Sequence, residues 1–287
     1  MTPRPRAGSL LQDLDLDKKQ LLDLLTLAGQ LKRDKEHGDE MPRLRGKSIV
    51  LVFEERSTRT RCSFEVAAHD QGAQVTHLGP EGPRLGREES VADTARVLGR
   101  LFDGIAVRGH TQETAEQFAR HAGVPVWNAL TDLWHPTRSL ADILTMIEHH
   151  GGGVEDIAFC FTGDGRRNVA RSLLVTGALL GMDVRIASPA GRQPPPDVVA
   201  AAEGAAVSSG ARLLVTDDLR TAVHGADFVY TAASNRPGVR FMHCRPAILD
   251  RGTAIDQMFE SARSIVFDQA ENRMHTIKAV LVRGLKA

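Results

Sequence analysis

The residues best suited to chemistry in this sequence are the hydroxyl residues and alternating arginines of Ser57-Thr58-Arg59-Thr60-Arg61. This run follows an apolar segment over 48–53, typical of a buried strand, and precedes a helix-like segment over 62–68. A turn from a strand into a helix presents backbone N–H groups and the positive end of the helix dipole to an anion. Hydroxyl groups add short donors, and arginine adds a planar fork that matches phosphate oxygens. The pattern predicts a phosphate site; the alternative is a Ser or Thr helix cap followed by solvated arginines.

Four further polar clusters fall where an apolar run ends, and open α/β sheets bind their ligands at such strand ends. Each also has a structural interpretation when taken singly: a histidine fixed before a proline, a cysteine in the core, or an arginine in solvent. Only the occurrence of all four clusters in one chain indicates a function. The clusters are Arg108, His135-Pro136-Thr137-Arg138, His243-Cys244-Arg245-Pro246, and the segment Asp268-Gln269-Ala270-Glu271-Asn272-Arg273-Met274-His275.

Short apolar runs alternate with amphipathic helical segments almost throughout the chain, which predicts an α/β fold with parallel sheets. Because 287 residues exceed the usual size of one core, we expect two doubly wound domains. Gly151-Gly152-Gly153 marks the junction, and the prolines at 194–196 open either a loop or a helix. The expected strands are 48–53, 73–78, 103–107, 156–162, 183–187, 211–215, 227–231, 239–243 and 264–268, and the expected helices are 17–36, 59–71, 89–101, 111–122, 137–150, 166–180, 217–224 and 270–283.

Composition, charge and cysteine spacing argue against several classes of protein. The 36 basic residues balance 36 acidic ones without a block of like charge, so nothing favours nucleic acid or an anionic membrane. The cysteines Cys62, Cys160 and Cys244 are far apart, which predicts neither a disulfide framework nor a zinc site. The sequence shows no signal peptide and no run long enough to span a bilayer, so we expect a cytoplasmic protein.

Taken together, the polar clusters resemble the aspartate/ornithine carbamoyltransferase family, and its ornithine branch more closely. The resemblance runs in one unbroken order over nearly the whole chain. It rests on Phe53-Glu54-Glu55-Arg56-Ser57-Thr58-Arg59-Thr60-Arg61, Asp93-Thr94-Ala95-Arg96-Val97-Leu98, Arg108-Gly109, Trp134-His135-Pro136-Thr137, His243-Cys244-x-Pro246 and Glu271-Asn272-Arg273-Met274-His275.

The resemblance implies an enzyme that moves the carbamoyl group of carbamoyl phosphate to the amine of an amino acid. No metal or organic cofactor is implied, because the leaving group is already good and the protein supplies positioning and charge stabilisation. The expected acceptor is ornithine, which gives citrulline and phosphate in arginine metabolism. Residues 1–150, together with a returning last helix over 270–287, would bind carbamoyl phosphate. Residues 151–269 would bind the amino acid, and the helix over 137–150 would bridge the two domains.

The resemblance also implies a role for each site residue. Ser57, Thr58, Arg59 and Thr60 would hold the phosphate, and Arg273 would reach the same anion from the last helix. Arg108 would bridge the phosphate and the carbonyl oxygen, to which His135 would donate a hydrogen bond. Cys244 would lie beside the incoming amine, and Asn168 would contact the amino acid. The family is typically a homotrimer, so Arg84 in the loop 82–90 would reach the phosphate of a neighbouring subunit or else remain a surface charge.

Three positions depart from the family pattern. Arg138 stands where the family has a glutamine, and arginine offers donors but no acceptor, so it either turns away or changes how the carbamoyl group is recognised. Arg245 adds a positive charge where a cationic amine is expected to arrive. Ala232 replaces the aspartate that would pair with the ammonium group, and the short run to Gly238 leaves out the closing Ser-Met-Gly loop.

These departures leave three interpretations open: an ornithine enzyme with a shortened lid, a carbamoyltransferase with another acceptor such as an anionic one, and a non-catalytic paralogue. The Gly163-Asp164-Gly165 run raises a fourth, a nicotinamide-binding protein. The expected third glycine is absent and the next strand does not end cleanly in an acidic residue, which argues against that class.

Overall fold

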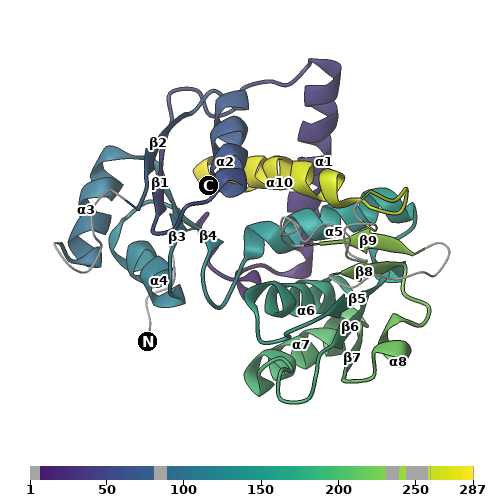
Figure 1. Cartoon of the computed structure of the whole chain (residues 1–287). Coiled ribbons are helices and arrows are strands. Elements are labelled where there is room, and N and C mark those ends of the chain that lie inside the picture. The colour runs from purple at the N-terminus through teal and green to yellow at the C-terminus, as the bar shows by residue number, and fades with distance from the viewer. Residues whose placement is uncertain (1–6, 81–88, 231–238, 244–257, 259, 287) are drawn as a thin grey trace. The chain divides into compact units, whose positions relative to one another are not determined.

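The computed structural model describes residues 7–80, 89–230, 239–243, 258 and 260–286 (Figure 1). The chain divides into two compact units, the first made of Met1–Leu140 with Arg273–Ala287 and the second of Ala141–Asn272. Helices α5 (Pro136–His150) and α10 (Val266–Lys286) each continue from one unit into the other. The structure therefore confirms the predicted fold class, with a helix joining two α/β units and a C-terminal helix that returns to the first. The units divide inside α5, near its amino end, rather than after residue 150.

The first unit is built on a parallel sheet with the strand order β2-β1-β3-β4. Its strands are β1 (Ser48–Phe53), β2 (Gln74–Leu78), β3 (Gly104–Arg108) and β4 (Val126–Leu130). Strand β1 lies between two neighbours, with Val50 opposite Thr76 on one side and Ile105 on the other. Every β1 residue after Ser48 is buried, which explains why this strand is a continuous apolar run in the sequence.

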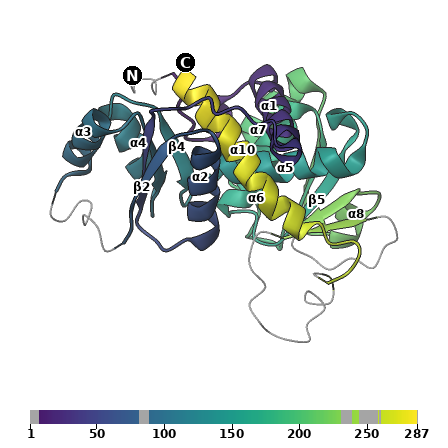
Figure 2. The same cartoon turned by 90° about the horizontal axis from the view of Figure 1, so that it is seen from above.

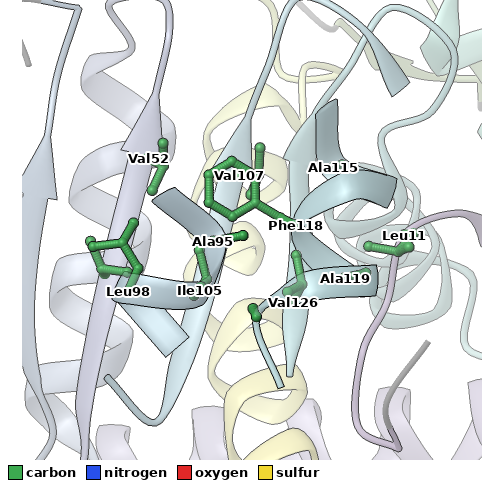
Figure 3. Close-up of a cluster of buried hydrophobic side chains, with 12 residues drawn as sticks. Leu11, Val52, Ala95, Leu98, Ile105, Val107, Ala115, Phe118, Ala119 and Val126 are labelled. Atoms are coloured by element: carbon green, nitrogen blue, oxygen red, sulfur yellow. The ribbon is translucent and has the colours of Figure 1, made fainter. Parts of the chain in front are cut away.

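Helices cover both faces of this sheet. They are α1 (Lys18–His37), α2 (Thr58–Asp70), α3 (Val91–Leu101) and α4 (Gln112–His121), preceded by a 3₁₀ turn, η1 (Asp13–Asp15). Figure 2 shows α3 and α4 on one side of the sheet and α2 with α10 on the other. On the α3 and α4 side, Leu98 and Phe118 belong to one buried apolar cluster with Ile105 and Val107 of β3 (Figure 3).

The second unit contains a parallel sheet with the order β7-β6-β5-β8-β9. Its central strand β5 is buried throughout, and Cys160 and Val229 lie in an apolar cluster beside it. The strands are β5 (Ala158–Thr162), β6 (Asp183–Ala187), β7 (Arg212–Thr216), β8 (Phe228–Tyr230) and β9 (Arg240–Met242), and the other elements are η2 (Val154–Asp156), α6 (Asn168–Leu180), α7 (Pro196–Ser209) and α8 (Leu219–Val223). In the described part of the chain, no helix is both long and apolar enough to cross a membrane.

Most expected elements are confirmed to within a few residues, and three differ. The strand predicted over 264–268 is wrong, because Ser264 forms only an isolated bridge to Phe241 and α10 begins at Val266. Strand β4 was not among the expected strands, since the polar Asn128 interrupts its apolar run. After the prolines at 194–196, where the sequence allowed either a loop or a helix, the chain forms a helix. Pro196 lies in its first turn, where a missing N–H costs no hydrogen bond.

Helix α10 is tied to α2 by a buried lysine. The Lys278 side chain is fully buried, and its Nζ lies 2.7 Å from a Glu40 carboxylate oxygen and 2.8 Å from Asp70 Oδ2 at the last residue of α2. Lys35 of α1 donates to the same Asp70 oxygen at 2.6 Å. Burial by itself raises the pKa of Asp70, but hydrogen bonds from Lys278 and Lys35 bring it below its ordinary value. This ion network fixes α10 against the carboxyl end of α2.

We expect Lys278→Met to lower the free energy of unfolding by about 3 kcal/mol, the lower end for a broken buried pair, because Glu40 and Asp70 lose their buried partner but Asp70 keeps Lys35. Lys19→Met is the matched control, since Lys19 pairs with Asp23 at 2.8 Å but both side chains are exposed. Urea denaturation at neutral pH measures both variants. A Lys278→Met protein no less stable than Lys19→Met would show that the network contributes nothing.

Candidate active site

The carboxyl ends of β1 and β3 define the place where a ligand is expected in the first unit. In the order β2-β1-β3-β4, the connections leave β1 and β3 toward opposite edges of the sheet, and such switch points form the binding crevice of open α/β folds. The segments that follow these strands are held together, since the Glu54 N–H donates to the Arg108 carbonyl at 2.9 Å. The Glu54 carboxylate in turn accepts the His110 N–H at 2.6 Å.

The phosphate site predicted at Ser57-Thr58-Arg59-Thr60-Arg61, which we call the cradle, lies at the amino end of α2. Ser57 occupies the N-cap position, but its side chain makes no capping hydrogen bond, and the first helical bond runs from the Arg61 N–H to the Ser57 carbonyl at 3.2 Å. The N–H groups of the first turn therefore have no acceptor within the helix. Thr58 and Arg59 are exposed, whereas Thr60 is buried. The capping alternative does not account for the Ser57 hydroxyl, and this helix end suits an anion.

Arg108, the last residue of β3, brings a largely buried guanidinium to this place. Its Nη2 lies 3.5 Å from the Glu55 Oε2, and its Nε is buried without a hydrogen-bond partner among the described residues. Burial lowers the pKa of Arg108, and the Glu55 carboxylate opposes that shift. Sequence reasoning gave Glu55 no role, although it stands directly before Arg56 and the cradle. Among the described residues the Arg108 charge is only partly compensated, which suits it to bind an anionic ligand.

Arg273 reaches the cradle from the other end of the chain. Its side chain is buried, and its Nη1 donates to the Thr60 Oγ1 at 3.4 Å across a separation of 213 residues. The structure thus brings the predicted anion ligand of the last helix to the first turn of α2.

His135 lies at the start of α5 and is buried among the arginines. Burial, followed by the charges of Arg273, Arg138 and Arg108, holds the pKa of His135 well below its ordinary value of 6.5. The imidazole is therefore neutral near pH 7, and its Nδ1 lies 3.4 Å from the Thr137 Oγ1. Arg138 is itself only 5% exposed, so it is buried near His135 rather than turned to solvent. A neutral histidine surrounded by guanidinium groups can donate one hydrogen bond without adding a positive charge.

The remaining predicted site residues belong to the second unit or lie outside the described residues. Asn168 is the first residue of α6, just after β5, and its Oδ1 accepts the Val169 N–H at 2.8 Å. In the order β7-β6-β5-β8-β9, the switch point falls between β5 and β8, so Asn168 follows a strand that borders it. Arg84, Ala232, Cys244 and Arg245 lie outside the described residues, and their roles stay predictions.

Among the residues that the structure describes, no three His, Cys, Asp or Glu side chains are gathered in a way that could hold a metal ion.

The buried neutral state of His135 predicts a pH-dependent stability. Below pH 6.5 the unfolded chain takes up a proton at this position and the folded protein does not, so the free energy of unfolding falls as the pH falls. We expect the contribution of His135 to approach about 1.4 kcal/mol per pH unit toward pH 5, and the slope of His135→Asn to be smaller by that amount. His275, whose pKa burial lowers to about 3, contributes to the slope of both proteins alike. Urea denaturation of both proteins in phosphate-free buffer measures the difference. Equal slopes would mean that His135 is protonated in the folded protein.

Comparison with known proteins gives one consistent result. Residues 9–148 match the family model described as aspartate/ornithine carbamoyltransferase, carbamoyl-P binding domain. Residues 155–235 and 232–283 match the model described as aspartate/ornithine carbamoyltransferase, Asp/Orn binding domain.

Solved structures are similar to the whole chain. The ornithine carbamoyltransferase from Pyrococcus furiosus is 35% identical, with a TM-score of 0.92 and 99% of both chains covered. That from Gloeobacter violaceus is 40% identical, with a TM-score of 0.86, covering 99% of this chain and 100% of the other. That from Thermus thermophilus is 38% identical, with a TM-score of 0.84, covering 97% of this chain and 99% of the other. The chain belongs to the aspartate/ornithine carbamoyltransferase family.

Proposed function

We propose that this carbamoyltransferase moves the carbamoyl group of carbamoyl phosphate to the side-chain amine of ornithine, giving citrulline and phosphate. The observation that carries the proposal is the gathering of Arg108, Arg138 and Arg273 around the neutral His135. Ornithine is proposed as the acceptor because the solved structures that are 35–40% identical to this chain are named ornithine carbamoyltransferases.

In this proposal the phosphate group of the substrate binds at the amino end of α2. The backbone N–H groups of that turn and the hydroxyls of Ser57, Thr58 and Thr60 donate to its oxygens. Arg59 and Arg273 add charged donors. The contact between Arg273 and Thr60 supports a single anion shared by both, because the two donors already lie 3.4 Å apart.

The reaction needs an amine nucleophile and a stabilised oxyanion. The neutral amine attacks the carbamoyl carbon, a C–N bond forms, and the carbonyl oxygen takes up negative charge in a tetrahedral intermediate. The C–O bond to phosphate then breaks, the bonding electron pair leaves with the phosphate, and the proton that the nitrogen loses is taken up by the departing phosphate. Arg108 and His135 donate to the developing oxyanion, and one such donor changes the rate by about 10²–10³. In this proposal the Thr137 hydroxyl, 3.4 Å from Nδ1, would donate to that nitrogen and leave the imidazole proton on Nε2.

The acceptor half of the proposal rests on fewer residues. Asn168 would contact the amino acid, Cys244 would lie beside the attacking amine, and Arg84 would complete the phosphate site of the next subunit in a homotrimer. We propose that the enzyme works without a cofactor, in the cytoplasm, as part of arginine metabolism.

A second candidate acceptor is an acidic amino acid such as aspartate. Arg138 favours it, because this buried guanidinium adds positive charge next to His135, where a carboxylate would be attracted and an ammonium group repelled. The family to which the chain belongs includes both acceptors by name.

A direct assay separates the candidates. Purified protein is mixed with carbamoyl phosphate and, in parallel, with ornithine, aspartate and a panel of other amino acids, and citrulline and other carbamoyl amino acids are quantified. We expect citrulline from ornithine at the highest kcat/KM. If carbamoyl aspartate is the main product, the acceptor is aspartate and not ornithine. No product from any amine, with phosphate still raising the Tm, would identify a binding protein without turnover.

The cradle itself is tested by a pair of arginine variants on α2. We expect Arg59→Ala to abolish most of the increase in Tm that inorganic phosphate gives to the wild type, because it removes a charged contact to the anion. Arg61→Ala is the matched control, since Arg61 is already paired with Glu65 at 2.8 Å. Thermal unfolding is followed with and without phosphate. Equal phosphate-dependent shifts in the two variants would remove Arg59 from the site.

A further inference from the structure

A buried polar network lies at the carboxyl end of β4, directly before His135. At its centre is Asn128, whose side-chain amide is completely buried. Its Nδ2 donates to the Leu11 carbonyl at 2.8 Å and lies within 3.1 Å of both the Gln112 Oε1 and the Thr131 Oγ1. The network joins the amino-terminal segment, strand β4 and the first turn of α4, all within the first unit.

Thr131 connects this network to the backbone of the next turn. Its hydroxyl donates to the Gln112 Oε1 at 2.6 Å and accepts the Trp134 N–H at 3.3 Å. The Thr131 N–H donates to the Trp134 carbonyl at 3.1 Å. The turn from Thr131 to Trp134 is therefore closed by hydrogen bonds in both directions.

The residue after this turn is His135, and it is also held from its other side. The Ser139 N–H donates to the His135 carbonyl at 3.2 Å, and the Ser139 hydroxyl donates to the buried Asp13 carboxylate at 2.5 Å. The amino-terminal segment thus contacts the chain on both sides of His135, at Asn128 and at Ser139. These bonds determine where the His135 backbone lies relative to β4.

We propose that Thr131, together with Asn128 and Gln112, is a positioning residue that holds the His135 imidazole in its hydrogen-bonding geometry. The inference rests on the proposed function, in which His135 donates to the carbamoyl oxygen. Two properties of the site make such positioning necessary. The imidazole carries one N–H as a neutral ring, so a rotated ring loses its only donor. A catalytic donor displaced by 1 Å can lose about 100-fold in rate.

Chemistry also separates this network from ordinary core packing. Buried polar groups are costly unless they are satisfied, and an apolar turn would fill the same space at a lower desolvation cost. Hydrogen bonds are directional, so they fix the orientation of the turn as well as its position. The network therefore fixes the turn whose last residue, Trp134, directly precedes the proposed oxyanion donor.

The test uses a matched pair at one position. Thr131→Val keeps the shape but removes the hydroxyl, whereas Thr131→Ser keeps the hydroxyl. We expect Thr131→Val to lower kcat about 10- to 100-fold with the KM for carbamoyl phosphate within about twofold, and Thr131→Ser to keep a kcat close to that of the wild type. In a His135→Asn background, Thr131→Val should cause no further loss, because the residue acts through His135.

The second measurement does not depend on turnover. In ¹⁵N-histidine NMR spectra, with His135 assigned by His135→Asn, we expect one set of ring signals in the wild type and broadened or doubled signals in Thr131→Val. Gln112→Met, which removes the same acceptor from α4, replaces Thr131→Val if that variant does not fold.

The outcomes distinguish the positioning role of Thr131 from the proposed function. Unchanged His135 signals and an unchanged kcat in folded Thr131→Val overturn the positioning role, as does an equal loss of kcat in the His135→Asn background. A wild type without turnover whose His135 signals still depend on Thr131 overturns the proposed function and leaves the positioning role standing.

Discussion

The structure of the first unit depends on a concentration of positive charge at the carboxyl end of its sheet. Arg108, Arg138 and Arg273 come from three separate elements, and their charges reach the same buried imidazole. Burial and then the charges of these guanidinium groups, which persist at any physiological pH, lower the pKa of His135, so the histidine is neutral. Its neutrality follows from its surroundings. An anion that binds at this place would pair with buried guanidinium groups, which would link ligand binding to the stability of the folded unit.

Helix α2 carries the turn proposed to bind the anion, and α10 contacts this helix at both ends. At the amino end of α2 the contact is between Arg273 and Thr60, and at the carboxyl end it is between Lys278 and Asp70. Buried ion pairs add little net stability compared with apolar contacts of the same size, but removing one partner is costly. They are therefore better suited to fixing one arrangement than to strengthening it. Here they fix how far along α2 the last helix lies, and hence which residues of the two helices meet.

Local pattern predicted most of the fold, because strands of a parallel sheet are buried on both faces and appear as short apolar runs. It failed where a polar residue interrupts the pattern: Asn128 lies in the middle of β4 and belongs to the polar network there. It also failed at 264–268, an apolar run that belongs partly to the start of α10. The helix end at which the phosphate site is proposed was predictable because its residues are contiguous. The meeting of Thr60 with Arg273 was expected only from the family resemblance, because no local pattern reports a contact across 213 residues.

The contact between Arg108 and Glu55 explains how a charged site of this kind coexists with a stable free protein. The two groups are 3.5 Å apart, and the Glu55 side chain is 51% exposed, so the carboxylate lowers the energy of the buried guanidinium while staying hydrated itself. A pair with one exposed partner contributes little net stability. A phosphate dianion carries more charge than a carboxylate and more oxygens to meet the planar fork of arginine. In the proposed function the phosphate would take the place of Glu55 as the partner of Arg108, and giving up a contact with a half-exposed carboxylate would cost little.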